Sequence, residues 1–269
     1  MNHDRARRMA ATALLACAPL AFVLATRREA RADDRSGVLE TRHRTFETPQ
    51  HFMFELRFGP YRPDIDSDPT LHGATPYGDT FGTPPHLMLG LELDYQAYRI
   101  PHLGTIGPGL SVAHVGISRQ AGFVTPHTSP DGTVVTSSAE STSFEIFPMY
   151  AVAVFRADVF ARDYHVPLVP YLKAGAGLAF WRGYNDAGTS SVGGIAAKGH
   201  TFGTHVAVGL AFNLNGLDQY TARNFDTAVG VNNTYLYWEY YASALNGIGQ
   251  TDALRVGNSS WVMGLAFEF

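Results

Sequence analysis

Two histidines with nearby serines are the residues of this sequence whose spacing could support catalysis. His114 lies three residues after Ser111 and four before Ser118, and His127 lies two residues before Ser129. A serine hydroxyl activated by a histidine base could cut or transfer an acyl chain. Ser and His at such short spacings are common by chance, and no G-x-S-x-G motif occurs. We therefore expect no catalytic residues and no enzyme activity, with a lipid-modifying enzyme as an alternative.

Metal-binding patterns are equally weak. His200 and His205 are five residues apart, and no H-E-x-x-H motif occurs. Asp64, Asp66 and Asp68 have the spacing that begins a calcium loop. A proline and a threonine stand where that loop needs its glycine and its bidentate glutamate. We expect neither a metal nor a cofactor.

Other ionisable residues recur at every second position, between large apolar side chains. Near residue 55, for example, Phe54 and Leu56 alternate with Glu55 and Arg57. Such a period of two indicates a β-strand with two unlike faces. Over the whole chain, this pattern places nine ionisable side chains on the strand faces opposite the apolar rows. They are Glu55, Arg57, Glu92, Asp94, Glu145, Lys173, His205, Glu239 and Glu268.

The last nine residues show the alternation most clearly. The large apolar residues on one face are Trp261, Met263, Leu265, Phe267 and Phe269. A strand whose outer face meets lipid needs such a row of side chains. These residues resemble the closing strand of bacterial outer-membrane β-barrels, where a terminal Phe after alternating apolar residues is the assembly signal.

Similar stretches predict eight strands joined by alternately long and short links. They lie near residues 52–59, 87–98, 109–120, 144–154, 171–181, 202–214, 233–242 and 261–269. We expect an all-β chain forming a single antiparallel transmembrane up-and-down β-barrel. In the third strand, either Leu110 and Val112 or the row from Ala113 to Ile117 could face lipid. This ambiguity and the long link at 215–232 leave ten strands as an alternative.

The N-terminal segment has the features of an export signal. Residues 1–32 contain a basic start, an apolar run and an A-x-A cleavage site, and we interpret them as a signal peptide. Residues 33–50 are expected to be a periplasmic lead-in and residues 51–269 the transmembrane barrel. A lipoprotein is the alternative, because Cys17, the only cysteine, follows a loose lipobox.

Composition agrees with a membrane barrel. Charged residues make up 16% of the chain, against about 25% in soluble domains, and glycine and aromatic residues are plentiful. Residues 1–32 contain six Arg and two acidic residues, so the 20 basic and 24 acidic residues fall to 14 and 22 without them. A mature chain this acidic is a poor candidate for nucleic-acid binding.

The chain as a whole resembles small outer-membrane barrel proteins of the OmpA, OmpX and OmpW type. Residues 54–66 (FELRFGPYRPDID) and 233–241 (NTYLYWEYY) resemble most closely an uncharacterised outer-membrane barrel family of myxobacteria and related lineages. The resemblance implies a monomer in the outer membrane of a Gram-negative bacterium, surrounded by lipid and lipopolysaccharide and inserted by the barrel-assembly machinery. It implies no particular activity.

An eight-stranded barrel is just wide enough for side chains to fill its interior. Charges there must pair, because an unpaired buried charge is costly, and we expect Arg57 and Lys173 to lie among the acids. The favoured function is therefore a structural or surface-interaction role, with a filled polar lumen and long extracellular loops. The alternatives are a narrow channel for small solutes or hydrophobic compounds and a soluble periplasmic β-sandwich or lipocalin-like barrel.

Overall fold

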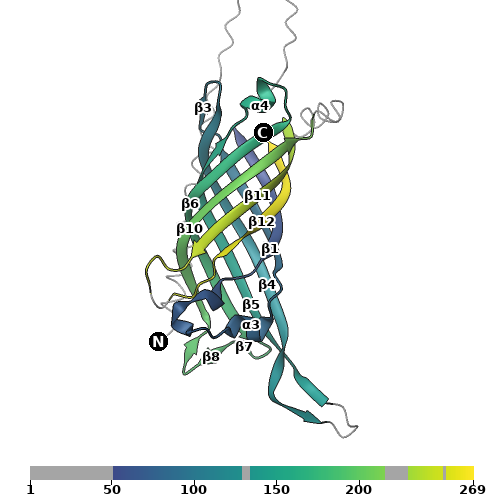
Figure 1. The fold of residues 1–269 in the computed structure, drawn as a ribbon, viewed down its shortest axis with the longest axis vertical. Coiled ribbons are helices and arrows are strands. Elements are labelled where there is room, and N and C mark those ends of the chain that lie inside the picture. The colour runs from purple at the N-terminus through teal and green to yellow at the C-terminus, as the bar shows by residue number, and fades with distance from the viewer. Residues whose placement is uncertain (1–50, 129–133, 216–229, 251–252) are drawn as a thin grey trace, which may run out of the picture. The chain divides into compact units, whose positions relative to one another are not determined.

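The computed structural model describes residues 51–128, 134–215, 230–250 and 253–269. The eight long strands are β1 (Phe52–Tyr61), β2 (His86–Tyr95), β4 (Gly104–Thr128), β5 (Val134–Arg156), β6 (Leu168–Asn185), β10 (Lys198–Asn213), β11 (Asn233–Leu245) and β12 (Asn258–Glu268). Each pairs antiparallel with the next, and β12 pairs with β1, so the sheet closes on itself (Figure 1). The predicted eight-stranded up-and-down barrel is confirmed. The signal peptide and the lead-in lie outside the described residues.

Short elements occupy the connections between the long strands. They are η1 (Ile65–Ser67), η2 (Pro69–Leu71), α3 (Pro76–Phe81), β3 (Tyr98–Ile100), α4 (Val159–Arg162), β7 (Gly188–Thr189), β8 (Ser191–Val192) and β9 (Ile195–Ala196). β3 pairs antiparallel with β4, and β7 with β6, and neither takes part in closing the barrel. Among the described residues, no helix combines the length and the apolar character needed to cross a bilayer.

The two ends of the barrel differ in their connections. We call the end that holds α3, β7 and β8 the loop end, and the opposite end, with α4 and Phe269, the terminal end (Figure 1). The link between the strands expected near 109–120 and 144–154 is instead mostly strand, because β4 continues to Thr128 and β5 begins at Val134. Its β-branched threonines and valines suit a two-stranded ribbon. Most of the 215–232 link lies outside the described residues.

Alternation along each strand separates an apolar exterior from a mixed interior. On β2, Leu87 and Leu91 are 62% and 45% exposed, whereas Glu92 between the leucines of the same strand is 2% exposed. On β1, Glu55 and Arg57 are likewise buried. Because successive side chains of a strand point to opposite faces, the closed sheet encloses the charges and leaves the leucines outside.

The closing strand β12 follows the same pattern. Its inward residues, Val262, Ala266 and Glu268, are buried, and its large apolar residues lie on the outer face. Phe269 joins the seam, because its carbonyl accepts hydrogen bonds from the backbone N–H groups of His51 (2.8 Å) and Phe52 (3.1 Å).

The pairing register between strands determines which face of β4 and of β5 points into the barrel. On β4, Leu110 and Val112 face outward, while Val115 is buried inside. On β5, the prediction was wrong: Ile146 is fully buried, and Glu145 lies on the opposite, outer side of the strand. Both faces of β5 are largely apolar, so alternation alone could not identify its inner face.

Candidate functional site

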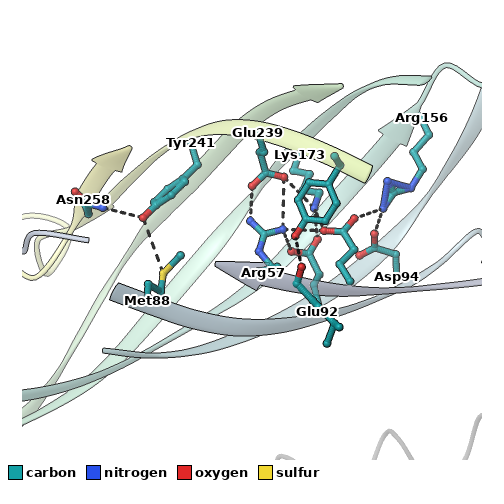
Figure 2. Close-up of polar contacts among 12 residues, drawn as sticks. Arg57, Met88, Glu92, Asp94, Arg156, Lys173, Glu239, Tyr241 and Asn258 are labelled. Carbon is teal, nitrogen blue, oxygen red and sulfur yellow. Dashed lines mark hydrogen bonds and ion pairs between the residues drawn. The ribbon is translucent and has the colours of Figure 1, made fainter. Parts of the chain in front are cut away.

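Seven ionisable residues from five strands meet inside the barrel and form the charge cluster. They are Glu55, Arg57, Glu92, Asp94, Arg156, Lys173 and Glu239, and all of them are buried. Neighbouring strands supply most of them, since Glu55 on β1 is directly opposite Glu92 on β2. Lys173 on β6 and Glu239 on β11 reach the cluster from across the barrel (Figure 2).

Lys173 lies at the centre of the acids. Its Nζ atom is 2.8 Å from Glu55 Oε2, 2.6 Å from Glu92 Oε1 and 3.0 Å from Glu239 Oε2. The side chain is fully buried. Three carboxylates therefore replace the water that an ammonium group would otherwise hold, which is the condition for a charge to be tolerated in a protein interior.

Arg57 bridges the same three acids from the other side. Its guanidinium donates to Glu55 Oε2 at 2.9 Å and to Glu92 Oε2 at 2.5 Å, and it also pairs with Glu239. The planar guanidinium has five donors in a fixed fork, so it can bind several carboxylates at once. The expectation that Arg57 and Lys173 lie among the acids matches this geometry.

Arg156 at the end of β5 is the member that the sequence reasoning missed. It pairs with Asp94 and donates to Glu55 Oε1 at 2.8 Å. It is two residues from buried Val154, so alternation would have placed it inside if the inner face of β5 had been identified. Arg156 also lies beyond the end of the strand that was expected near 144–154.

The cluster contains four carboxylates and three cations, so it holds one more acid than base. The ring of Tyr171 lies beside two of the cations, with its centroid 5.2 Å from Arg156 Cζ and 5.0 Å from Lys173 Nζ. A cation over an aromatic face is stabilised by the ring quadrupole. Arg156 and Lys173 therefore have both carboxylate and aromatic partners.

Two of the predicted interior residues lie inside the barrel but outside the cluster. His205 stacks between Tyr150 and Tyr241, with ring centroids 4.1 Å and 5.6 Å away. Glu268 lies at the terminal end, where it accepts hydrogen bonds from Gln96 Nε2 (2.6 Å) and other polar groups.

Glu145 does not lie inside the barrel as predicted. We predicted it in the lumen with the other acids, but it pairs instead with Arg182 on the outer side of β5 and β6, at 2.7 Å. Tyr184 also donates to it, at 3.1 Å. The two partners come from β6 near the loop end, so Glu145 belongs to the rim of the barrel.

An aromatic and apolar region fills the barrel between the charge cluster and the loop end. Tyr241 accepts a hydrogen bond from Asn258 at 2.7 Å and lies beside Met88, at a distance from the acids (Figure 2). Farther toward the loop end, Tyr61 is fully buried and donates to the carbonyl of Val256. The described interior thus changes from charged to apolar along the barrel axis.

Three acids of the charge cluster are close enough together to be considered as metal ligands. Oxygen atoms of Glu55, Glu92 and Asp94 lie within 4.8 Å of one another, close enough to share a cation. Lys173 and Arg156 already bind these oxygens. The carboxylates that a metal would need are therefore paired with protein cations.

The aspartates of the calcium-like spacing have separate structural roles. Asp68 accepts hydrogen bonds from the backbone N–H and hydroxyl of Thr70 and caps η2. Asp66 accepts from the backbone N–H groups of Tyr77 and Gly78 at 2.9 Å and 3.0 Å, and so binds the first turn of α3. Side chains used in this way stabilise short helices.

Of the serines near His114, Ser118 lies on the same outer face of β4 but accepts a hydrogen bond from Ser143, at 3.0 Å. Ser111 is buried in the barrel, whereas His114 lies on the outer face of β4 against Phe147. His200 is exposed and His205 is buried, so these two also face opposite sides of β10. The pair formed by residues 127 and 129 lies outside the residues whose side chains are described.

The solved structures that this chain matches include three small outer-membrane proteins. Ail, the attachment invasion locus protein of Yersinia pestis, is 14% identical with a TM-score of 0.40, over 82% of this chain and 97% of that chain. OprG of Pseudomonas aeruginosa is 12% identical with a TM-score of 0.40, over 82% and 96%. OmpW of E. coli is 15% identical with a TM-score of 0.34, over 82% and 98%.

The chain matches no protein-family model. It also has no significant match among curated proteins. The more specific resemblance of residues 54–66 and 233–241 to a myxobacterial barrel family stays a prediction.

Proposed function

We propose that this chain is an integral outer-membrane protein of a Gram-negative bacterium, with a closed lumen and a structural or surface-interaction role. The observation that supports this most strongly is the inverted polarity of the barrel. Leu87, Leu89 and Leu91 are exposed on its outer face, whereas Glu55, Lys173 and Glu239 are almost completely inaccessible. Soluble monomers rarely expose apolar patches larger than a few hundred Å².

Strand length is consistent with a membrane span. β1 and β2 have ten residues each, or about 33 Å at about 3.3 Å per residue. At a tilt of about 40° they cover about 25 Å along the barrel axis, which is the height of the apolar band of outer-membrane barrels. With both ends of the barrel segment at the terminal end, we assign that end to the periplasm and the loop end to the cell surface.

The charge cluster supports a closed lumen. Ions that cross a pore need sites that they can enter and leave, but here Arg57, Lys173 and Arg156 bind the acids at hydrogen-bond distance. Near the terminal end, a cavity of about 10 Å³ between Gln96 and Glu268 holds at most about one water. The narrow cation-preferring channel is therefore the less favoured function.

Electrical recording tests the closed lumen directly. Purified full-length protein, reconstituted in planar bilayers, is expected to give no stable conductance steps, or only very small ones. Large, stable, cation-selective steps would refute the closed lumen and favour the channel. Fractionation with outer membranes and a heat-dependent shift in gel mobility test the membrane assignment independently, and both are expected.

We also propose that the barrel works as a monomer without enzymatic activity. Two observations support the second part: Ser111 and His114 lie on opposite faces of β4, and Ser118 is hydrogen-bonded to Ser143. Lipid and lipopolysaccharide are its proposed surroundings, and the barrel-assembly machinery its proposed insertion partner. A change in the mass of lipid A or phospholipid on expression, lost in His114→Ala or His127→Ala, would favour a lipid-modifying enzyme instead.

A further inference from the structure

A cavity of about 580 Å³ lies at the loop end of the barrel. Its walls come from α3, the loop ends of β5 and β6, and the connections that precede β10 and β12. The large side chains lining it are Ile65, Phe81, Phe144, Trp181, Ile195 and Leu254. Among the described residues that line it, Tyr77, Ser190 and Ser191 carry a hydroxyl group and none is charged. Pockets of about 300–1,000 Å³ with mostly apolar linings are typical of sites for small molecules.

One wall of this loop-end pocket is a row of aromatic rings. The ring centroids of Tyr77 and Phe81 are 5.4 Å apart, those of Phe81 and Phe144 are 6.2 Å apart, and those of Phe144 and Trp181 are 6.3 Å apart. Asp66 holds the helix that supplies the first two rings, through hydrogen bonds to the backbone of α3. The wall is therefore built by tertiary contacts and exists before any ligand binds.

Two of the residues that line the pocket, Phe81 and Trp181, pack against a filled apolar core. The apolar side chains of Ile117, Ile146 and Val256 are 2%, 0% and 0% exposed, and they belong to the core against which Phe81 and Trp181 pack. Because this layer is filled, the pocket is suited to holding a molecule and not to passing it through the barrel. A ligand must enter and leave from the loop end.

One of the large apolar residues that line the pocket is mostly exposed. Ile195 in β9 is 79% exposed although it lines the pocket. Leaving such a side chain in water forfeits most of the free energy that its burial would give. We propose that the loop-end pocket binds a single alkyl chain, which covers Ile195 on one side and the aromatic row on the other.

This inference goes beyond the proposed function, since membrane insertion and a closed lumen need no pocket ligand. The chain could belong to a free fatty acid or to a membrane lipid, and both offer the same methylenes to the pocket. Each methylene transferred from water is worth about 0.8 kcal/mol. Lengthening a bound chain by two methylenes is therefore expected to tighten binding roughly tenfold.

Quenching of Trp181 fluorescence by a brominated alkyl chain tests the proposal. The other two tryptophans, Trp238 and Trp261, face outward and are replaced by Phe. The full-length protein in nanodiscs of ordinary phospholipid is titrated with ω-bromododecanoic acid. Saturable quenching of Trp181 is expected.

Gly183→Leu is the variant that fills the pocket. Gly183 lines the cavity, and a Cβ atom built there would be 3.4 Å from Ala197 Cβ and 3.9 Å from Phe144 Cδ2, so the strand can accept it. Gly116→Leu is the matched control, because a Cβ at Gly116 would meet only the ring of His114 on the outer face. Gly183→Leu should weaken binding at least tenfold, and Gly116→Leu should leave it unchanged.

A second pair of variants keeps the test independent of how Gly183→Leu folds. Ile195→Asn should weaken binding, whereas Ile248→Asn, an equally large change at an exposed isoleucine in the next connection, should not. Nanodiscs of brominated phospholipid without fatty acid distinguish the source: quenching of Trp181 there assigns the chain to a bilayer lipid. The proposal would be overturned if neither the fatty acid nor the phospholipid gave specific quenching of Trp181. It would also be overturned if Gly183→Leu and Ile195→Asn were quenched as strongly as the parent.

Discussion

Replacing Lys173 by methionine should destabilise the barrel more than most other single changes. The substitution keeps the length of the side chain but removes the ammonium group that contacts Glu55, Glu92 and Glu239 within 3.0 Å. Opposite unit charges 3 Å apart attract by about 5–6 kcal/mol at an effective dielectric constant of about 20. Much of that attraction only offsets the cost of removing the charges from water.

The loss on mutation is therefore smaller than the summed attraction. Removing one partner of a buried ion pair typically costs about 3–5 kcal/mol, because it leaves the other charge buried without compensation. We expect Lys173→Met to lower the free energy of unfolding by this amount. Lys198→Met, which alters an exposed lysine of β10, is the matched control and should change it by less than about 0.5 kcal/mol.

Reversible urea unfolding in phospholipid vesicles, followed by tryptophan fluorescence, measures both changes. Adding Glu92→Gln to Lys173→Met removes one of the uncompensated acids, so the double variant should recover about 1–3 kcal/mol. A Lys173→Met protein as stable as the parent, or a double variant less stable than Lys173→Met, would contradict the description of the cluster as an ion-pair network.

Three further predictions concern the seam and the loop end. Deleting Phe269 removes three backbone hydrogen bonds to His51 and Phe52. Unfolding titrations should therefore show that the free energy of unfolding falls by about 2–4 kcal/mol. A stability equal to that of the parent would argue against a role of Phe269 in closing the barrel. Asp66→Ala removes the cap of α3 and should cost about 1 kcal/mol, with faster amide exchange in α3; unchanged exchange would contradict this role. Hydrogen bonds from the hydroxyl and N–H of Ser141 hold the pKa of Asp186 below its usual value. The Ser141 amide should therefore be fully protected from hydrogen exchange above pH of about 4, and this protection should be lost as the pH falls through the lowered pKa. Exchange protection that rises on acidification would reverse that sign.

The sequence alone was sufficient for the architecture. Leucines at every second position of residues 87–93, opposite Glu92 and Asp94, require a strand with one apolar and one charged face. Because the side-chain period of a strand is two, the faces of β1, β2, β6, β10 and β12 follow once one of them is known. The interior position of Glu55, Arg57 and Lys173 was predicted in this way.

Where both faces of a strand are apolar, the same rule says nothing. Glu145 was placed inside and Arg156 was missed for this reason, since β5 has apolar residues on both faces, such as Ile146 on the inner one and Phe147 on the outer one. Only pairing with β4 and β6 decides which face is inner. The ribbon that extends β4 and β5 was missed because turn residues within it were interpreted as a loop.

Tertiary structure also decided which interior charges meet. Alternation places Glu268 and His205 on the same side as Lys173, but it contains no information about depth along the barrel, which depends on the stagger between strands. The loop-end pocket was invisible in the sequence for a related reason. Its aromatic row joins Tyr77, Phe81, Phe144 and Trp181, which come from segments far apart in the chain. Periodicity reports the face of each element, and only the packing of elements against one another brings such residues together.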